Sequence, residues 1–198
     1  NNGVEWETLD RVRNITSIER DPNTIITMGG GRPQKNNIVI CEAIKLLNEK
    51  KGNKFKLIVL GRDYRDTEKI KSYDFVDYIG QVDHDQIYFY LRKAQIFIQN
   101  SFVESFGLAP IEALISGCDI LVSKNVGAIC IMQSIQQSDI INDCTNPTEL
   151  VKKIEYLLNN TNNVRLLDGI DRTKTSCKYA ANRLMQIIEE LVTKGKIS

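Results

Sequence analysis

The stretch "IFIQNSFVESFGLAPIEALIS" (96–116) joins a short apolar run to an apolar helical pattern through a loop of polar and small residues. The run at 96–100 is rich in β-branched and aromatic residues, as buried strands are. Pro110 suits the first turn of a helix, and Gly117 is a typical residue for its end. A strand that leads directly into a helix is half of a parallel β-α-β unit, so the stretch predicts an α/β protein.

The same alternation extends in both directions along the chain. Apolar runs predict further strands at 24–28, 55–61, 74–80, 119–123 and, more weakly, 139–143. Helical spacing of apolar residues predicts helices at 38–50, 83–94, 147–160 and 179–192. About six strands that alternate with helices predict a Rossmann-like, doubly wound parallel sheet. Because no composition break suggests a linker, we assign residues 1–198 to a single domain.

The predicted architecture restricts where a ligand can bind. In doubly wound sheets, ligands lie at the carboxyl ends of the strands, near the point where the strand order reverses. That rule selects the loops at 29–37, 61–66 and 100–108.

Composition excludes several other classes of function. The net charge of the 198 residues is +1, which gives no overall field for nucleic acid. No apolar run approaches the length that spans a bilayer. The five cysteines form no CxxC pair, so we expect reduced thiols, no metal site and a cytoplasmic protein.

The loop at 100–108 carries the first candidate binding groups. Backbone N–H groups at the start of the next helix carry the positive end of its dipole, and Gly107 leaves space beside them for a phosphate or a hydroxyl. The carboxylates of Glu104 and Glu112 could accept hydrogen bonds from two sets of hydroxyls, which a nucleotide sugar offers. Two alternatives stay open here: Glu112 suits any helix start, and Glu104 could be an ordinary exposed loop carboxylate.

The loop "GGGRPQKNN" (29–37) carries the second set. It has neither the G-x-G-x-x-G spacing of a dinucleotide site nor the G-x-x-x-x-G-K-[ST] spacing of a P-loop. Arg32 and Lys35 are cations that could neutralise a diphosphate, although a solvated basic loop would look the same. His84 is the single histidine and favours a surface position over a catalytic one, which disfavours Ser-His-Asp and Cys-His hydrolases.

Five stretches occur in the order and at the spacing of a known enzyme family. They are "NGVE" (2–5), "PQKNN" (33–37), "YIGQV" (78–82), "NSFVESFGLAPIEAL" (100–114) and "SGCDILVSKNVGA" (116–128). Together they resemble the carboxyl-terminal, donor-binding domain of the GT-B glycosyltransferases, in particular the retaining enzymes of family 4 (group 1). The resemblance runs from about residue 2 to the last helix.

The resemblance implies roles for the candidate residues. Glu112 would bind the ribose hydroxyls, Glu104 would contact the transferred sugar, and Lys35 would hold the diphosphate and stabilise the leaving nucleotide. The remaining binding positions are the backbone N–H groups of Phe106, Gly107 and Leu108, the glycine loop at Gly30, and a base-binding wall at Gly61 and Val82. The implied ligand is a UDP-sugar or GDP-sugar, with UDP favoured, and neither a cofactor nor a metal is expected.

One position departs from the pattern of that family. The family usually has an arginine five residues before the lysine, where this chain has Gly30. Arg32 stands two positions later. Either a shorter loop lets Arg32 reach the same phosphate, as we expect, or the cation is missing and catalysis is weak or absent.

The resemblance also implies a second half. We expect an amino-terminal, acceptor-binding domain of roughly 150–200 residues before this one, and we expect the present chain to bind donor but to catalyse little alone. The acceptor would be a glycan or a lipid-linked glycan. A lipid-linked acceptor would bring the full-length protein into peripheral contact with the inner face of a membrane. The apolar face of the 179–192 helix would then be partly exposed here.

Three other functions fit parts of the pattern. A glycosidase would use Glu104 and Glu112 as acid and base. A retaining enzyme needs the two carboxyl groups about 5–5.5 Å apart and an inverting one about 6.5–9.5 Å, whereas here a loop and a helical turn separate them around a ligand-sized gap. A sugar-nucleotide epimerase of the same fold usually needs further acids and histidines, which a single histidine does not supply. A degenerate, non-catalytic binding or scaffold domain is favoured by Gly30 in place of the arginine.

Overall fold

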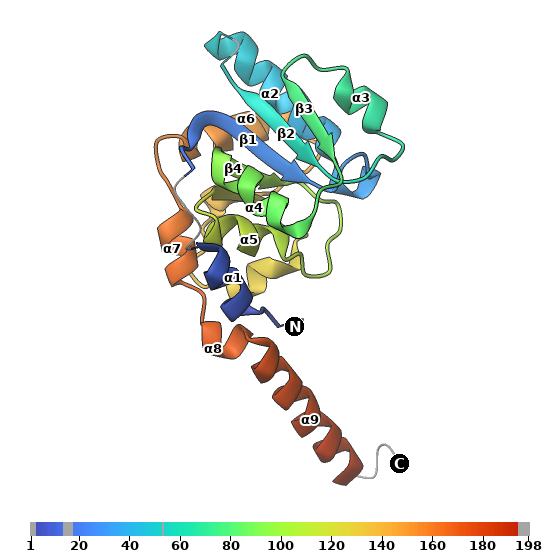
Figure 1. Cartoon of the computed structure of the whole chain (residues 1–198), viewed down its shortest axis with the longest axis vertical. Coiled ribbons are helices and arrows are strands. Elements are labelled where there is room, and N and C mark those ends of the chain that lie inside the picture. Colours follow the sequence, from blue (N-terminus) through green and yellow to red (C-terminus); the bar gives the residue numbers. More distant parts are fainter. Residues whose placement is uncertain (1–2, 14–17, 53, 194–198) are drawn as a thin grey trace.

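The strands form one parallel sheet. The computed structural model describes residues 3–13, 18–52 and 54–193, and within them the strand order is β3-β2-β1-β4-β5-β6 (Figure 1). The strands are β1 Asp21–Met28, β2 Lys56–Leu60, β3 Val76–Gly80, β4 Ala94–Gln99, β5 Asp119–Ser123 and β6 Ile140–Ile141. Every neighbouring pair is parallel, which confirms the predicted Rossmann-like, doubly wound sheet.

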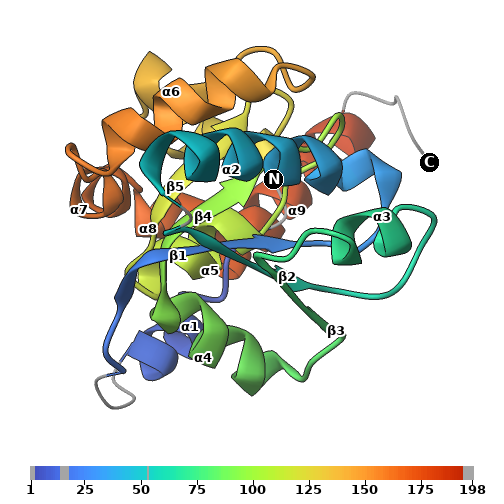
Figure 2. The same ribbon diagram turned by 90° about the horizontal axis from the view of Figure 1, so that it is seen from above.

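Helices cover both faces of the sheet (Figure 2). Side chains of α2 (Asn37–Lys51) and α6 (Pro147–Leu157) pack on one face. The other face is covered by α1 (Trp6–Arg13), α4 (His84–Lys93), α5 (Ala109–Ile115) and α7 (Asn163–Asp168). The further elements are α3 (Thr67–Lys71), α8 (Arg172–Thr175), α9 (Cys177–Thr193) and three 3₁₀ turns at Pro33–Lys35, Gly127–Ile131 and Gln137–Asp139.

The sequence patterns predicted α2, α4, α5, α6 and α9 but missed α1, which has 8 residues, and the three shortest helices. Helices α2, α4, α5, α6 and α9 lie where apolar spacing or turn residues placed them, and Asp83 with Gln86 caps the start of α4. Helices α3, α7 and α8 have only 5, 6 and 4 residues. So few residues complete hardly more than one turn, and a helical period cannot be recognised in them.

Successive strand residues feed two apolar clusters. In β4, Phe97 belongs to the cluster under α4 and α5, while Ile96 and Ile98 belong to the cluster under α2 and α6. In β2, Ile58 belongs to the cluster under α4 and α5, and Leu57 belongs to the cluster under α2 and α6. Strands buried on both faces need apolar side chains at every position, and this explains why they read as continuous apolar runs.

The strand order reverses at the centre of the sheet. From β1 the chain builds β2 and then β3 on one side, and β4 returns to pair with β1 on the other. The carboxyl ends of β1 and β4 lead into the loops at 29–36 and 100–108. Two of the three loops selected from the sequence therefore flank the reversal point, and the third follows the neighbouring strand β2.

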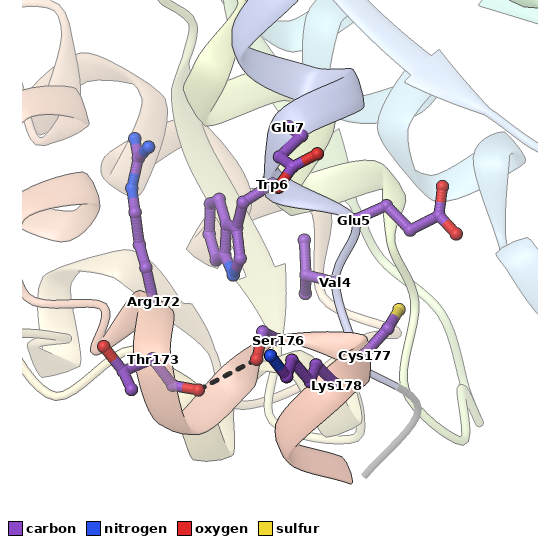
Figure 3. Close-up of a pocket in the computed structure, with 9 residues that line it drawn as sticks. All are labelled: Val4, Glu5, Trp6, Glu7, Arg172, Thr173, Ser176, Cys177 and Lys178. Carbon is purple, nitrogen blue, oxygen red and sulfur yellow. Dashed lines mark hydrogen bonds between the residues drawn. The ribbon is translucent and has the colours of Figure 1, made fainter. Parts of the chain in front are cut away.

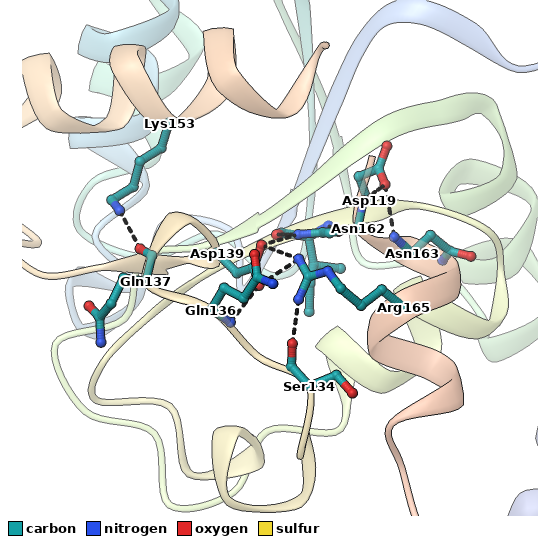
Figure 4. Close-up of polar contacts among 10 residues, drawn as sticks. Asp119, Ser134, Gln136, Gln137, Asp139, Lys153, Asn162, Asn163 and Arg165 are labelled. Carbon is teal, nitrogen blue, oxygen red and sulfur yellow. Dashed lines mark hydrogen bonds and ion pairs between the residues drawn. The ribbon is translucent and has the colours of Figure 1, made fainter. Parts of the chain in front are cut away.

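A buried polar network closes the opposite, amino edge of the sheet (Figure 4). Arg165 of α7 donates to both carboxylate oxygens of the fully buried Asp139, at 3.0 Å each. The side chain of Asn162 donates to Asp139 at 2.9 Å, and its backbone N–H donates to Asp119 at 2.7 Å. This network holds β6, which has only two residues where the sequence predicted five.

The last helix leaves the body of the protein (Figure 1). None of the residues of α9 is buried, and Leu184 is 59% exposed. The exposed apolar face expected for the 179–192 helix is therefore present. In the described part of the chain, no helix is both long enough and apolar enough to cross a membrane.

Candidate functional site

Two glycines allow the loops after β1 and β2 to touch. A Cβ atom on Gly30 would overlap the carbonyl oxygen of Arg62, and a Cβ on Gly61 would lie 2.5 Å from the backbone nitrogen of Gly30. Both glycines have positive φ angles, 57° and 128°. The sequence predicted a ligand-binding role for the glycine loop at Gly30 and a base-binding wall at Gly61, and these roles stay predictions. The structure shows that the two glycines leave room for each other, so the two loops pack backbone to backbone.

Lys35 and Glu104 form an ion pair across the reversal point. The ammonium group of Lys35, in the 3₁₀ turn after β1, contacts Oε2 of Glu104 in the loop after β4. Both side chains are about one-fifth exposed, at 21% and 20%. A Cβ atom at position 29 would overlap Cγ of Lys35. Because Gly29 has no Cβ, the Lys35 side chain can pass beside it. The two predicted groups are thus brought together from opposite sides of the central strand pair.

Gln99 is a third member of this group. It is the last residue of β4, and its Nε2 donates to Oε2 of Glu104 at 3.3 Å. A Cβ on Gly107 would lie 2.8 Å from Cγ of Glu104 and 3.2 Å from Nε2 of Gln99. The bare backbone of Gly107 therefore covers the Gln99–Glu104 contact. No role for Gln99 was predicted from the sequence, although a polar residue that ends an apolar strand is a recognisable signal.

A second segment holds the loop that carries Glu104. The backbone N–H of Glu104 donates to the carbonyl of Asn125, and Gly127 donates back to the carbonyl of Glu104, at 3.2 and 3.0 Å. Ala128 donates to the carbonyl of Phe106 at 2.7 Å. A Cβ on Gly127 would overlap the carbonyl oxygen of Ser105. Backbone pairing therefore fixes the loop, together with the buried side chain of Phe106 and the side-chain contacts of Glu104.

The backbone amides of Phe106, Gly107 and Leu108 lie just before helix α5, in the loop that carries Glu104. In the described residues, none of these three N–H groups donates to a protein acceptor. The side chain of Phe106 is buried and that of Leu108 is exposed. Gly107 adopts a φ of 81°, which turns the chain just before α5. The sequence predicted these three amides as ligand contacts, and this stays a prediction.

Glu112 faces a different partner from Glu104. Its Oε1 lies 3.5 Å from Nε2 of His84, which projects from the start of α4. Both residues line a cavity of about 300 Å³ together with Leu108 and the segment around Val4. Burial raises the pKa of Glu112, and the neighbouring His84 opposes that rise. His84 is exposed, as the sequence predicted, but its contact with Glu112 was not foreseen.

The remaining predicted residues lie around these two pairs. Arg32 stacks on Tyr64, with its guanidinium carbon 4.9 Å from the ring centroid and its Nη2 3.1 Å from the hydroxyl. It therefore has a partner on the loop after β2, where Gly61 also lies. Val82 follows β3 and packs against the apolar cluster on the α4 face. Glu104 is not among the residues that line the cavity at Glu112.

A larger cavity shares Val4, Glu5 and Cys177 with the cavity at Glu112 (Figure 3). It measures about 500 Å³ and is lined by residues of the first helix region and of α8 and α9, among them Trp6 and Arg172. The guanidinium of Arg172 lies over the Trp6 ring at 4.8 Å and pairs with Asp10 at 2.9 Å. None of the predicted site residues lines this cavity.

Metal binding finds no support in the described side chains. No group of three or more His, Cys, Asp or Glu residues there is arranged to hold a metal ion. Cys41, Cys118, Cys130, Cys144 and Cys177 are all free thiols.

The strand order and the helices on both faces are those of the GT-B glycosyltransferase fold. Residues 10–172 match the family model described as glycosyl transferases group 1, so the chain belongs to the group 1 glycosyltransferase family. No curated protein matched the chain.

Solved structures agree with this fold. Sucrose-phosphate synthase from Thermosynechococcus elongatus superposes with a TM-score of 0.70 at 20% identity, over 97% of this chain and 52% of that one. α,α-Trehalose 6-phosphate synthase from Burkholderia multivorans gives 0.75 at 8% identity, over 98% and 50%. A UDP-forming α,α-trehalose-phosphate synthase from Burkholderia xenovorans gives 0.67 at 10%, over 89% and 48%. The chain spans about half the length of these structures.

Proposed function

We propose that this chain is the carboxyl-terminal, donor-binding half of a retaining family 4 glycosyltransferase. The observation that carries the proposal is the Lys35–Glu104 ion pair at the reversal point of the sheet, beside the backbone amides of residues 106–108. A cation, free N–H groups and a carboxylate at one place suit a ligand that has both phosphates and sugar hydroxyls. The group 1 family membership of the chain makes a nucleotide sugar the ligand class that fits best.

The chemistry follows from the charges. Transfer of a hexosyl group leaves negative charge on the departing nucleoside diphosphate, and Lys35 would stabilise that charge more in the transition state than before it. The amides of Phe106, Gly107 and Leu108 would bind phosphate or sugar oxygens. Glu104 would accept from hydroxyls of the transferred sugar, and Glu112 would accept from the ribose. Lys35 would exchange part of its contact with Glu104 for the diphosphate.

The identity of the nucleotide and the acceptor is also part of the proposal. UDP is the favoured nucleotide, and one structure with this fold is described as a UDP-forming synthase. The acceptor would be a glycan or a lipid-linked glycan bound mainly by another domain, and no cofactor or metal would be needed. We expect a cytoplasmic protein that contacts the inner membrane face when its acceptor is lipid-linked, and little activity from this half alone.

A non-catalytic nucleotide-sugar-binding or scaffold domain is the second candidate. Two observations favour it: Gly30 stands where the family usually has an arginine, and Arg32 is engaged with Tyr64. A phosphate that binds here would have to draw Arg32 away from a stacked, hydrogen-bonded partner. If Arg32 stays with Tyr64, only Lys35 is left of the two predicted cations to stabilise the leaving group.

Ligand-dependent stability tests the proposal. UDP-, GDP- and ADP-sugars are titrated while thermal unfolding is followed, and one nucleotide family should stabilise the chain by about 2.7 kcal/mol at a hundredfold excess over Kd. Glu112→Ala should abolish the gain. Glu189→Ala, on the exposed helix α9, is the matched control and should keep it. No stabilisation by any nucleotide sugar would reject the donor-binding function. Stabilisation that Glu112→Ala leaves intact would reject the assigned site.

A further inference from the structure

Gln99 lies beneath the carboxylate of Glu104. It is 4% exposed and is the last residue of β4. Its Nε2 donates to Oε2 of Glu104 at 3.3 Å, and the backbone of Gly107 packs over both side chains. An amide at this place is unusual for the strand, since Ile96, Phe97 and Ile98 before it are all apolar and fully buried.

The orientation of the Gln99 amide follows from chemistry. A carboxylate only accepts hydrogen bonds, so the NH₂ group must face Glu104, because the amide oxygen there would be repelled. The Oε1 atom of Gln99 then points elsewhere and is buried without a hydrogen-bond partner in the described part of the protein. A buried acceptor without a partner costs folding free energy. The fold alone therefore gives no reason to prefer Gln99 over an apolar residue of the same length.

The contacts of Glu104 show what the amide does. Lys35 and Gln99 both contact the same oxygen, Oε2, so the other oxygen of the carboxylate remains available to a ligand. Lys35 is the mobile partner in the proposed function, because a bound diphosphate competes for its ammonium group. Gln99 is neutral and buried, and a phosphate has no comparable attraction for it. Once Lys35 turns to the phosphate, Gln99 is the remaining hydrogen-bond partner of the Glu104 carboxylate among the described residues.

We infer that Gln99 is a positioning residue that holds the Glu104 carboxylate toward the transferred sugar when the donor is bound. This inference rests on the proposed function. It predicts that Gln99 matters for the sugar part of the donor and not for the nucleotide part, since only Glu104 is held by it. Gln99→Met keeps the length and volume of the side chain but removes both the amide donor and the unpaired oxygen.

The first experiment compares UDP with UDP-glucose, and GDP with GDP-mannose, by calorimetry. Gln99→Met should bind the nucleoside diphosphate as wild type does but bind the nucleotide sugar roughly tenfold or more weakly, the size expected for a hydrogen bond to a charged group. Its thermal stability without ligand should be unchanged or higher. Gln95→Met is the matched control, because Gln95 donates to Asp119 at 2.8 Å at the other end of the same strand. That variant should bind both ligands as wild type does.

The second experiment uses pH. Gln99→Glu places two carboxyl groups in contact, and one of them should hold a proton at low pH and donate it as the amide did. Lys35 is the other charged group at this pair and limits, but does not remove, the repulsion. Nucleotide-sugar binding by Gln99→Glu should therefore recover as pH falls and be lost as pH rises, relative to wild type. Nucleotide-sugar binding by Gln99→Glu that stays constant with pH would contradict the inference.

A third measurement needs no ligand. The side-chain amide NMR signals of Gln99 should shift with the protonation of the Glu104 carboxyl group, and they should stay constant in Glu104→Gln. Constant signals in wild type, or equal nucleotide-sugar binding by wild type and Gln99→Met, would overturn the inference about Gln99 but not the proposed function. Failure of the wild-type chain to bind any of the four ligands would instead reject the proposed function, and the inference with it.

Discussion

His84 Nε2 lies 3.5 Å from Glu112 Oε1, which joins the single histidine of the chain to the carboxylate at the start of α5. The contact links α4 to α5, and both residues line the same cavity as Leu108. The proposed role of Glu112 needs an ionised carboxylate, because only that form accepts hydrogen bonds with both oxygens. Burial works against ionisation, and His84 works for it.

Removing His84 should therefore raise the pKa of Glu112 further. In His84→Ala the carboxylate loses the neighbour that offsets its burial. A ¹³C NMR titration of the glutamate carboxyl carbons measures the change directly, and nucleotide-sugar binding should begin to fail at a higher pH than in wild type. His84→Gln, which keeps an N–H donor without a charge, should lie between the two. An unaltered Glu112 titration in His84→Ala would show that the contact has no electrostatic effect.

The same raised pKa gives a sign for pH-dependent stability. The folded chain holds the Glu112 proton more tightly than the unfolded chain, so the contribution of this group to stability is highest below the ordinary carboxyl pKa and falls as pH rises through the raised one. Glu112→Gln should therefore gain stability relative to wild type between about pH 4 and about pH 7. Urea unfolding at both pH values measures this difference.

Glu155 provides the control of opposite sign. The hydrogen bond from Lys50 lowers the pKa of Glu155, so its contribution is present at neutral pH and is lost as pH falls. Glu155→Gln should therefore be less stable than wild type at neutral pH, and this difference in stability should disappear at low pH. If both variants changed in the same direction, the assigned cause of the Glu112 shift would be wrong.

Lys35 should decide affinity for the second phosphate. In Lys35→Ala the loss of one charge-assisted contact should weaken UDP binding by roughly 1.5–3 kcal/mol, or roughly 10- to 100-fold, while UMP binding changes much less. Calorimetry with both nucleotides separates the two effects. Lys50→Ala removes an exposed lysine whose partner is Glu155 on α6, and this variant should bind both nucleotides as wild type does. Equal losses for UDP and UMP would place Lys35 away from the diphosphate.

Gly127 should be needed for the shape of the loop that carries Glu104. In Gly127→Ala the new Cβ would overlap the Ser105 carbonyl oxygen, and we expect roughly 1–3 kcal/mol of destabilisation with weaker nucleotide-sugar binding. Gly52→Ala is a comparison in which a Cβ meets nothing within 4 Å but the φ of 80° is left-handed. It should cost roughly 1–2 kcal/mol and leave binding intact. Differential calorimetry and ligand titration together distinguish the two.

The Asp139–Arg165 pair should contribute to folding and not to binding. Arg165→Met leaves the fully buried Asp139 carboxylate without its cation, which should cost roughly 3–5 kcal/mol. Adding Asp139→Asn should recover part of the loss. Because the pair lies at the amino edge of the sheet, nucleotide affinity of the folded fraction should stay unchanged in both variants. Lower affinity in the double variant would mean that the two edges are coupled.

The sequence predicted those parts of the fold that depend on local patterns. Strands buried on both faces contain continuous apolar runs, here at 57–60 in β2 and 96–98 in β4, so both strands could be recognised without any tertiary information. Strand β6 was predicted too long. Its two residues are held by contacts of Asp139 and Asn162, and because the partners of these residues are distant in the sequence, local patterns could not show where the strand ends. Glu104 and Lys35 were both selected as site residues from the loops that they occupy.

The contacts between segments that are distant in the sequence could not be predicted from local patterns. His84 and Glu112 are separated by 28 residues, and Arg32 and Tyr64 by 32, so nothing in either neighbourhood shows the pairing. Gln99 was visible as a polar residue at the end of an apolar run, but its role depends on where the Glu104 loop returns. The assigned ligand contacts of the site residues remain predictions for the experiments above.

Helix α9 carries a last consequence. Its 17 residues bury nothing against the sheet, so its helicity has to come from its own backbone hydrogen bonds and side-chain neighbours. A stretch of that length is only marginally ordered in water by itself. Its amide protons should therefore exchange with solvent orders of magnitude faster than those of β1 or β4, and slow exchange there would report that another surface has covered it.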